Sequence, residues 1–207
     1  MDLTIFLTFL GLKKIMSGKL FIVSAPSGAG KTSLVNEILT RLQPKYPIDR
    51  LVTYTSREIR PGEREGIDFC YVTPQEFEKR AQEGFFLECS KEYECYYGSP
   101  NCVKDDLKKG DSRVLVIDRN GAKQVVDAVS DAVTIWIYAP SIDVLKKRLV
   151  NRGLNSVEQI ERRIELAKTE LEEEEKSKFY KYHVLNDNFD QAADNLESIF
   201  INELKKF

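Results

Sequence analysis

Residues 19–42 read KLFIVSAPSGAGKTSLVNEILTRL, and this stretch decides the fold. Its first seven residues, 19–25, form a short apolar run rich in β-branched side chains, which is typical of a buried parallel strand. The segment PSGAGK interrupts that run, and from Thr32 to Leu42 apolar side chains return at helical spacing, up to Pro44 and Pro47. The stretch therefore predicts a buried strand, a glycine-rich loop and a helix in immediate succession.

The loop in this stretch resembles the phosphate-binding pattern G-x-x-x-x-G-K-[ST], with Ala25 in place of the leading glycine. In such a loop, successive backbone N–H groups converge on one point and the helix N-terminus adds partial positive charge. We expect Lys31 to reach the β- and γ-phosphates of a nucleoside triphosphate and the Thr32 hydroxyl to ligate Mg²⁺. The predicted ATP-binding residues of the loop are Ala25, Pro26, Ser27, Gly28, Ala29, Gly30, Lys31 and Thr32.

Strand-like and helical patterns alternate again in the second half of the chain. Alternation of this kind at both ends of the chain predicts a parallel sheet with helices on both faces. The expected strands are 112–118, 132–138 and 182–187, and the expected helices are 121–128, 141–150, 157–178 and 189–205.

Residues 52–102 lack this alternation and predict an inserted unit of short strands. Thr73 and Glu76 form a capping-box pattern that predicts a helix over 74–83. The other elements expected here are strands at 51–55, 69–73, 85–89 and 92–98 and a helix at 101–109.

The composition is that of a soluble globular protein. The chain has 207 residues, of which 42% are hydrophobic and 31% charged, and 31 Lys+Arg against 33 Asp+Glu leave a formal net charge of −2. Proteins that bind nucleic acid usually carry a clustered positive excess, so we expect no nucleic-acid partner. No apolar run approaches the ~18 residues that a membrane span needs, so we expect no membrane partner either.

Four cysteines, Cys70, Cys89, Cys95 and Cys102, lie within one stretch. They form no C-x-x-C pair, and the single histidine, His183, lies about 80 residues further on, so the spacing does not predict a zinc site. A secreted disulfide scaffold would be shorter and denser in cysteine. We therefore expect reduced thiols in a cytoplasmic protein.

The first residues, MDLTIFLTFLGLKKI, precede the folded pattern, which starts only at Lys19. Three interpretations are open: a wrongly assigned start codon ahead of Met16, a disordered extension, or a weak amphipathic anchor. We favour the first, and we expect residues 1–16 to be a non-structural extension.

A second candidate anion site lies in the loop 55–63, TSREIRPGE, which carries Arg57 and Arg60. Each guanidinium offers a fork of donors that can grip two phosphate oxygens. Judged on these residues alone, a phosphate site and a solvated surface loop are both open.

With this loop included, the sequence resembles the guanylate kinase family. The resemblance runs in family order from Lys19 to the C-terminus. It is carried by SAPSGAGKTSL (24–34), TSREIRPGEREGIDF (55–69), FFLE (85–88), YYGS (96–99), VIDRNGAK (116–123), LKKRLVNRG (145–153), RRIELAKTEL (162–171) and VLND (184–187).

The resemblance implies an α/β fold with a P-loop NTPase core, in which helices flank a parallel sheet, and the reaction ATP + GMP ⇌ ADP + GDP. It also implies a small mixed β/α GMP-binding insert and a mobile lid. The expected guanylate-kinase-like domain spans 17–206, with a core of 19–51 and 103–207, the insert at 52–102 and the lid at 148–165.

Residue roles follow from the same resemblance. Glu88 is expected to read guanine, because a carboxylate accepts both N1–H and the exocyclic amino group, whereas adenine presents an acceptor at N1. The GMP-binding residues implied are Thr53, Arg57, Arg60, Phe69, Glu88, Tyr97, Ser99 and Asp118. The catalytic residues implied are Lys31, Arg57, Arg148, Arg152 and Arg163, and Asn186 is expected to border the adenine of ATP.

Two positions depart from the family pattern. Phe69 stands where the family usually has a tyrosine on the acceptor phosphate, so one donor is missing unless Tyr71 or Tyr97 replaces it. Val116 stands where many relatives have an aspartate that can act as an outer-sphere magnesium partner.

Two alternatives to a guanylate kinase are a kinase of the same architecture with another acceptor, such as AMP, UMP or a phosphorylated sugar, and an inactive binding module. Glu88 argues against the former, and Lys31 with Arg163 against the latter. We expect ATP and GMP as substrates, Mg²⁺ bound with ATP, and a monomer or homodimer.

Overall fold

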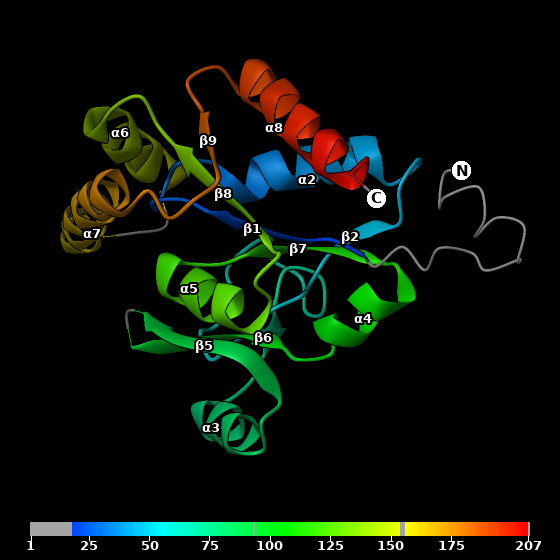
Figure 1. The fold of residues 1–207 in the computed structure, drawn as a ribbon. Helices are drawn as coiled ribbons and strands as arrows, with labels where there is room; N and C mark the ends of the chain where they lie inside the picture. The colour runs from blue at the N-terminus through cyan, green and yellow to red at the C-terminus, as the bar shows by residue number, and fades with distance from the viewer. Residues whose placement is uncertain (1–17, 93, 154–155, 207) are drawn as a thin grey trace, which may run out of the picture.

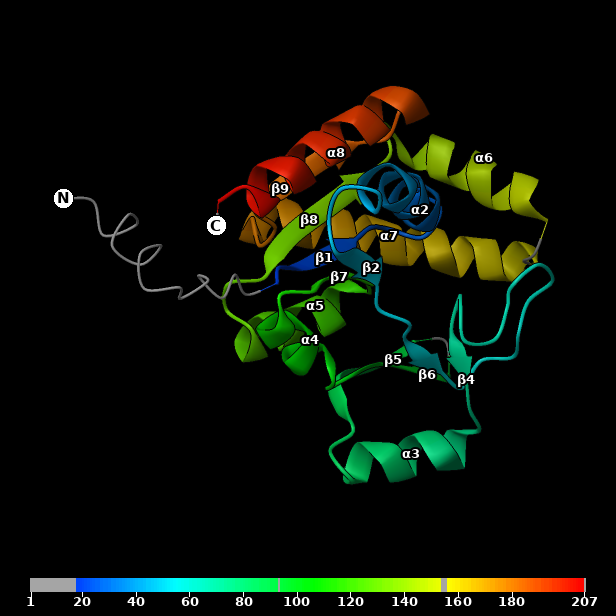
Figure 2. The ribbon, with the colours of Figure 1, turned by 90° about the vertical axis from the view of Figure 1, so that its right-hand side faces the viewer.

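The computed structural model describes residues 18–92, 94–153 and 156–206. Over these residues the chain forms two β-sheets with helices packed around them (Figures 1 and 2). The predicted N-terminal extension, 1–16, and residues 154–155 of the predicted lid lie outside the described residues.

The central sheet is parallel throughout and has the strand order β2-β7-β1-β8-β9. Its middle strand, β1, is buried along its whole length between β7 and β8, as the apolar run predicts. The strands are β1 (Leu20–Ser24), β2 (Ile48–Arg50), β7 (Ser112–Val116), β8 (Val133–Tyr138) and β9 (Tyr182–Leu185).

Side chains of β1 alternate between two halves of the core, because successive strand residues point to opposite faces. Phe21 packs with the helices α2 (Lys31–Leu42) and α8 (Phe189–Leu204), and its ring stacks on Phe200 with centroids 4.1 Å apart. Ile22 packs on the other face with α4 (Val103–Lys109) and α5 (Arg119–Ala128). The remaining core helices are α6 (Ile142–Arg152) and α7 (Val157–Ser177). The predicted parallel sheet with helices on both faces is confirmed.

The second sheet has the strand order β4-β3-β6-β5 and combines parallel and antiparallel pairs. The helix α3 (Pro74–Gln82) packs on it through Phe77, whose ring stacks on Phe86 with centroids 4.4 Å apart. Half of the predicted capping box forms at its start: the Thr73 hydroxyl accepts the Glu76 N–H at 3.1 Å, while the Glu76 carboxylate pairs with Arg80. The strands are β3 (Tyr54–Thr55), β4 (Cys70–Tyr71), β5 (Phe86–Glu92) and β6 (Cys95–Pro100).

The predicted strand at 51–55 is wrong in its bounds, because this segment passes from one sheet to the other. The central sheet takes Ile48–Arg50 as its edge strand β2, and the Leu51 N–H still donates to Val114 O at 3.0 Å. The second sheet takes Tyr54–Thr55 as β3.

Among the described residues, no helix combines the length and apolarity needed to cross a membrane.

Candidate active site

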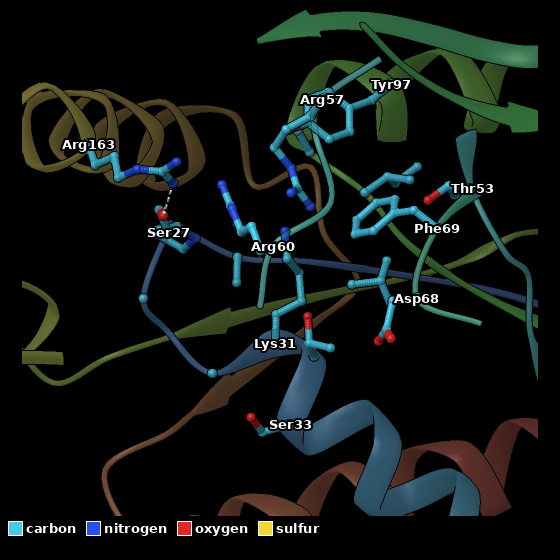
Figure 3. Close-up of a pocket in the computed structure, with 18 of the residues that line it drawn as sticks. Ser27, Lys31, Ser33, Thr53, Arg57, Arg60, Asp68, Phe69, Tyr97 and Arg163 are labelled. Atoms are coloured by element: carbon cyan, nitrogen blue, oxygen red, sulfur yellow. Dashed lines mark hydrogen bonds between the residues drawn. The ribbon is translucent and has the colours of Figure 1, made fainter. Parts of the chain in front are cut away.

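A cavity of about 560 Å³ opens at the carboxyl ends of the parallel strands, where ligands bind in open α/β sheets. Its walls come from the loop after β1, from the second sheet, and from α6 and α7. Figure 3 shows Lys31, Arg57 and Arg60 converging on one space, with Phe69 on one side of it and Arg163 on the other.

The phosphate loop has the backbone shape that its glycines predict. Gly28 and Gly30 have φ of 89° and 92°, a region that side chains disfavour, and α2 begins directly at Lys31. The N-cap residue, Gly30, supplies no side-chain cap to the N–H groups at the start of this helix, which suits them to an anion.

Asn186 supports this loop from behind. Its side chain is 3% exposed and donates from Nδ2 to Ala29 O at 2.7 Å. A Cβ atom on Gly30 would lie 2.4 Å from the same Nδ2, so any side chain at position 30 would displace Asn186. Asn186 does not line the cavity, and its expected place beside adenine stays a prediction.

The loop 56–69 joins β3 to β4 in the second sheet and carries the two arginines of the predicted anion site. Both arginines are organised around Glu63. Its carboxylate accepts from Arg57 Nη2 at 2.9 Å, from the Arg60 backbone N–H at 2.9 Å and from the Tyr71 hydroxyl at 2.7 Å. Burial opposes the ionisation of Glu63, but these hydrogen bonds, led by that of Tyr71, lower its pKa below the ordinary value. The carboxylate thus holds the loop that presents both arginines.

Phe69 lines the cavity with the Arg57 guanidinium 5.4 Å from its ring centroid. The Tyr71 hydroxyl is engaged by Glu63, and burial with this acceptor raises the pKa of Tyr71 to about 12. Of the two tyrosines expected to replace the donor missing at Phe69, Tyr97 lines the cavity and Tyr71 does not.

Glu88 lies in β5 and is only 3% exposed. Its Oε1 accepts the Ser99 hydroxyl at 2.6 Å, while its Oε2 is buried without a hydrogen-bond partner among the described residues. Burial and the nearby Asp118 raise the pKa of Glu88 to about 7, although the Ser99 hydroxyl favours the charged form. A buried, half-satisfied carboxylate at a cavity wall is suited to a ligand that brings its own N–H groups.

Asp118 joins the second sheet to the core. Its Oδ1 accepts the Gly121 N–H at 2.8 Å and caps α5, which therefore begins before the predicted start at residue 121. Its Oδ2 accepts the Ser90 hydroxyl from β5 at 2.5 Å. The carboxylate thus stands beside Glu88, with Thr53 on the same cavity wall.

Three arginines from α6 and α7 line the cavity on the side of the phosphate loop. Arg163 donates from Nη1 to the Ser27 hydroxyl at 2.8 Å across 136 residues of sequence (Figure 3). Arg148 donates from Nη2 to Asn186 O at 2.9 Å, while its Nη1 is buried with no partner in the described part of the chain. Arg152 lies in the last turn of α6.

The cavity brings together every predicted site residue except Ala29, Ser99 and Asn186, which are buried behind its wall. Val116 also lines it. Sequence reasoning missed six polar lining residues, of which Ser33, Glu63, Asp68 and Glu170 stand inside the segments that carry the family resemblance and had a signal there. The other two, Arg50 and Ser90, lie on strands whose pattern says nothing of a site.

Comparison with known proteins agrees with this geometry. The family model of guanylate kinase matches residues 17–203. Guanylate kinase of Hahella chejuensis is 39% identical over 188 residues, which cover 88% of this chain and 86% of that protein. Guanylate kinase of Coxiella burnetii is 41% identical over 178 residues, which cover 86% of this chain and 84% of that protein.

A solved structure shows the same fold. The crystal structure of guanylate kinase from Anaplasma phagocytophilum matches with a TM-score of 0.75 and 28% sequence identity, and the match covers 92% of this chain and 88% of that chain. The predicted P-loop NTPase fold is thereby confirmed. Because the family model spans nearly the whole described chain, the protein belongs to the guanylate kinase family of nucleoside monophosphate kinases.

Proposed function

We propose that this chain transfers the γ-phosphoryl group of Mg-ATP to GMP, giving ADP and GDP, with the residue roles set out below. The observation that carries the proposal is the buried Glu88 carboxylate, which shares one cavity with a phosphate loop and an arginine pair. That combination suits a purine at one end and two sets of phosphates at the other.

Glu88 would read guanine. When ionised, it accepts both N1–H and the exocyclic amino group. Its Oε2, which has no hydrogen-bond partner in the described part of the chain, has the capacity for one of these hydrogen bonds. Ser99 orients the carboxylate, while Thr53 and Asp118 border the base. Sites that pair buried polar groups with a substrate reject analogues lacking those groups by about 10⁴-fold. Adenine would leave Glu88 facing an acceptor.

Arg57, Arg60 and Tyr97 would hold the phosphate of GMP, which is already an anionic nucleophile, so the reaction needs no general base. The loop 25–32 would hold the triphosphate, with Lys31 at its β- and γ-phosphates. Catalysis is then a matter of positioning and of neutralising charge on the transferring group.

The chain's donors suit magnesium. Thr32 is exposed at the first turn of α2 and lines the cavity, so its hydroxyl would ligate Mg²⁺. No group of three or more His, Cys, Asp or Glu side chains that could hold a metal occurs among the described residues, so the ion would rely mainly on phosphate and water oxygens. When bound, Mg²⁺ would supply positive charge that offsets the charge of the phosphate groups.

We assign residues 148–165 to a lid, 52–102 to the GMP-binding insert and the rest of 19–207 to the core. Arg148, Arg152 and Arg163 would close over the triphosphate and neutralise charge as transfer proceeds. Closure would also exclude water, which otherwise competes with GMP as the acceptor.

We place the enzyme in the cytoplasm, where the unpaired cysteines stay reduced.

The test is ADP release from Mg-ATP by the purified protein with GMP, AMP, UMP, CMP or no acceptor. We expect release with GMP alone. ADP release with another acceptor would show that Glu88 does not select guanine. A folded protein that binds ATP but releases no ADP in any of these reactions would overturn the proposal.

A further inference from the structure

Positive charge is concentrated where the loop 56–69 lines the cavity. Burial lowers the pKa of Arg60, and the guanidinium groups of Arg57 and Arg163 lower it further. Arg57 has the carboxylate of Glu63 as its partner, but Arg60 uses only its backbone N–H on that carboxylate. Cationic side chains that converge on a cavity in this way predict an anion between them.

Arg50 adds a fourth guanidinium to this region, and the proposed function gives it no role. It stands at the end of the edge strand β2 and lines the same cavity. Its Nη2 donates to Asp68 O at 3.1 Å, and its guanidinium carbon lies 5.8 Å from the Phe69 ring centroid. Phe69 thus has both Arg50 and Arg57 within cation–π distance.

The hydrogen bonds of Arg50 are incomplete. Its Nε is buried and has no acceptor in the described part of the chain, and burial lowers its pKa. The acidic groups near it, Asp68 and Glu63, attract its charge but form no ion pair with it within the described ranges. A buried N–H donor on a charged group is costly to leave unpaired, so the arrangement favours an incoming acceptor.

We propose that Arg50 is a third arginine of the acceptor-phosphate site, held in place by Asp68 O and the Phe69 ring and donating to the phosphate of GMP. The inference rests on the proposed function and deepens it. It assigns a role in binding the phosphate of GMP to a residue that lies outside the segments that carry the family resemblance. In this arrangement Phe69 contributes a ring that positions two guanidinium groups, and Arg50 supplies a donor that a phenylalanine lacks.

The experiment compares Arg50→Met with Arg50→Lys. Methionine keeps the length of the side chain without its charge, and lysine keeps the charge without the planar fork. The matched control is Arg80→Met, because Arg80 also lies over two aromatic rings, 5.1 Å from the Tyr54 centroid and 5.4 Å from that of Phe85, but does not line the cavity.

For each variant we would measure KM for GMP, KM for ATP and the inhibition constant of guanosine, which lacks the phosphate. In Arg50→Met we expect KM for GMP to rise about 10- to 100-fold, because the variant loses one hydrogen bond to a charged group. KM for ATP and the guanosine constant should change less than about twofold, because neither ligand places a group on this donor. Arg50→Lys should fall between the wild type and Arg50→Met, and Arg80→Met should leave all three values unchanged.

Equal losses for GMP and guanosine would assign Arg50 a purely structural role, and an unchanged KM for GMP would place it outside the site. Either result overturns the inference. If Arg50→Met does not fold, as judged by its thermal melting curve, Arg50→Lys carries the same comparison. A wild-type protein that fails to phosphorylate GMP would instead refute the proposed function, so the two failures are distinguishable.

Discussion

Gly121 in α5 lies directly against the Glu88 carboxylate of β5, and a Cβ atom on residue 121 would come within 2.6 Å of Glu88 Oε2. The contact explains how the start of α5 approaches the second sheet so closely. It also means that the smallest possible side chain at position 121 would push the carboxylate out of its place.

We therefore expect Gly121→Ala to raise KM for GMP about 10-fold or more, because overpacking of this kind costs about 1–3 kcal/mol. KM for ATP should not change. Asn120→Ala, at an exposed position of the same helix turn, is the control and should be silent. An unchanged KM for GMP in Gly121→Ala would show that the Glu88 carboxylate can shift without loss of recognition.

The raised pKa of Glu88 predicts that substituting this residue changes the free energy of unfolding in a pH-dependent way. Burial raises this pKa from 4.5 to about 7, so between these values the folded protein binds a proton that the unfolded chain does not. The stabilisation from this proton is complete below pH 4.5 and is lost as the pH rises through 7. Glu88→Gln should therefore be more stable than the wild type at pH 8 by roughly 1–3 kcal/mol, and similar to it near pH 4.5. Urea unfolding at both pH values measures the difference, and a less stable variant at pH 8 would contradict it.

GMP recognition should have the opposite pH dependence. A neutral Glu88 cannot accept both N–H groups of guanine, so KM for GMP should rise as the pH falls through about 7. Glu88→Gln should lose most of its GMP activity and should lack this pH dependence. Since the phosphate of GMP titrates in both proteins, the difference between their profiles isolates Glu88. Parallel profiles would mean that the carboxylate is already ionised across the range.

Lys31 begins α2 at the floor of the cavity. Lys31→Met should lower kcat by at least about 100-fold. The variant loses a preorganised positive charge beside the transferring phosphoryl group, which raises the activation free energy by on the order of 3 kcal/mol or more. Lys108→Met, at an exposed ion pair on α4, is the matched control. A near-normal kcat in Lys31→Met would remove this lysine from the catalytic assignment.

Deletion of residues 1–15 should leave kcat unchanged and the melting temperature within about 2 °C of the wild type. The start of the fold is held by residues beyond this segment: the Gly18 N–H donates to Leu107 O at 2.6 Å, and the Lys19 N–H donates to the Ser112 hydroxyl at 3.0 Å. An insoluble or inactive product would show that the segment contributes to folding.

Local patterns predicted much of this molecule because they record local physics. The apolar run of 20–24, the glycines at 28 and 30 and the helical spacing after Lys31 each act within a few residues, and all three are confirmed. The segment 51–55 shows where this fails. The five residues read as one continuous strand, yet the chain passes from one sheet to the other within them. The cause is that pairing partners more than 40 residues away decide where each strand ends.

The sequence by itself determined the phosphate loop, the parallel sheet and the family, since these depend on residue type and short spacing. Only the tertiary structure decided that Glu88 is buried against Gly121, with one carboxylate oxygen that has no partner among the residues described, and that Glu63 holds Arg57. It alone placed Arg50 beside Phe69 on the cavity wall. Burial and hydrogen-bond pairing depend on segments that are distant in sequence, so charge state and partnership appear only when the chain is folded.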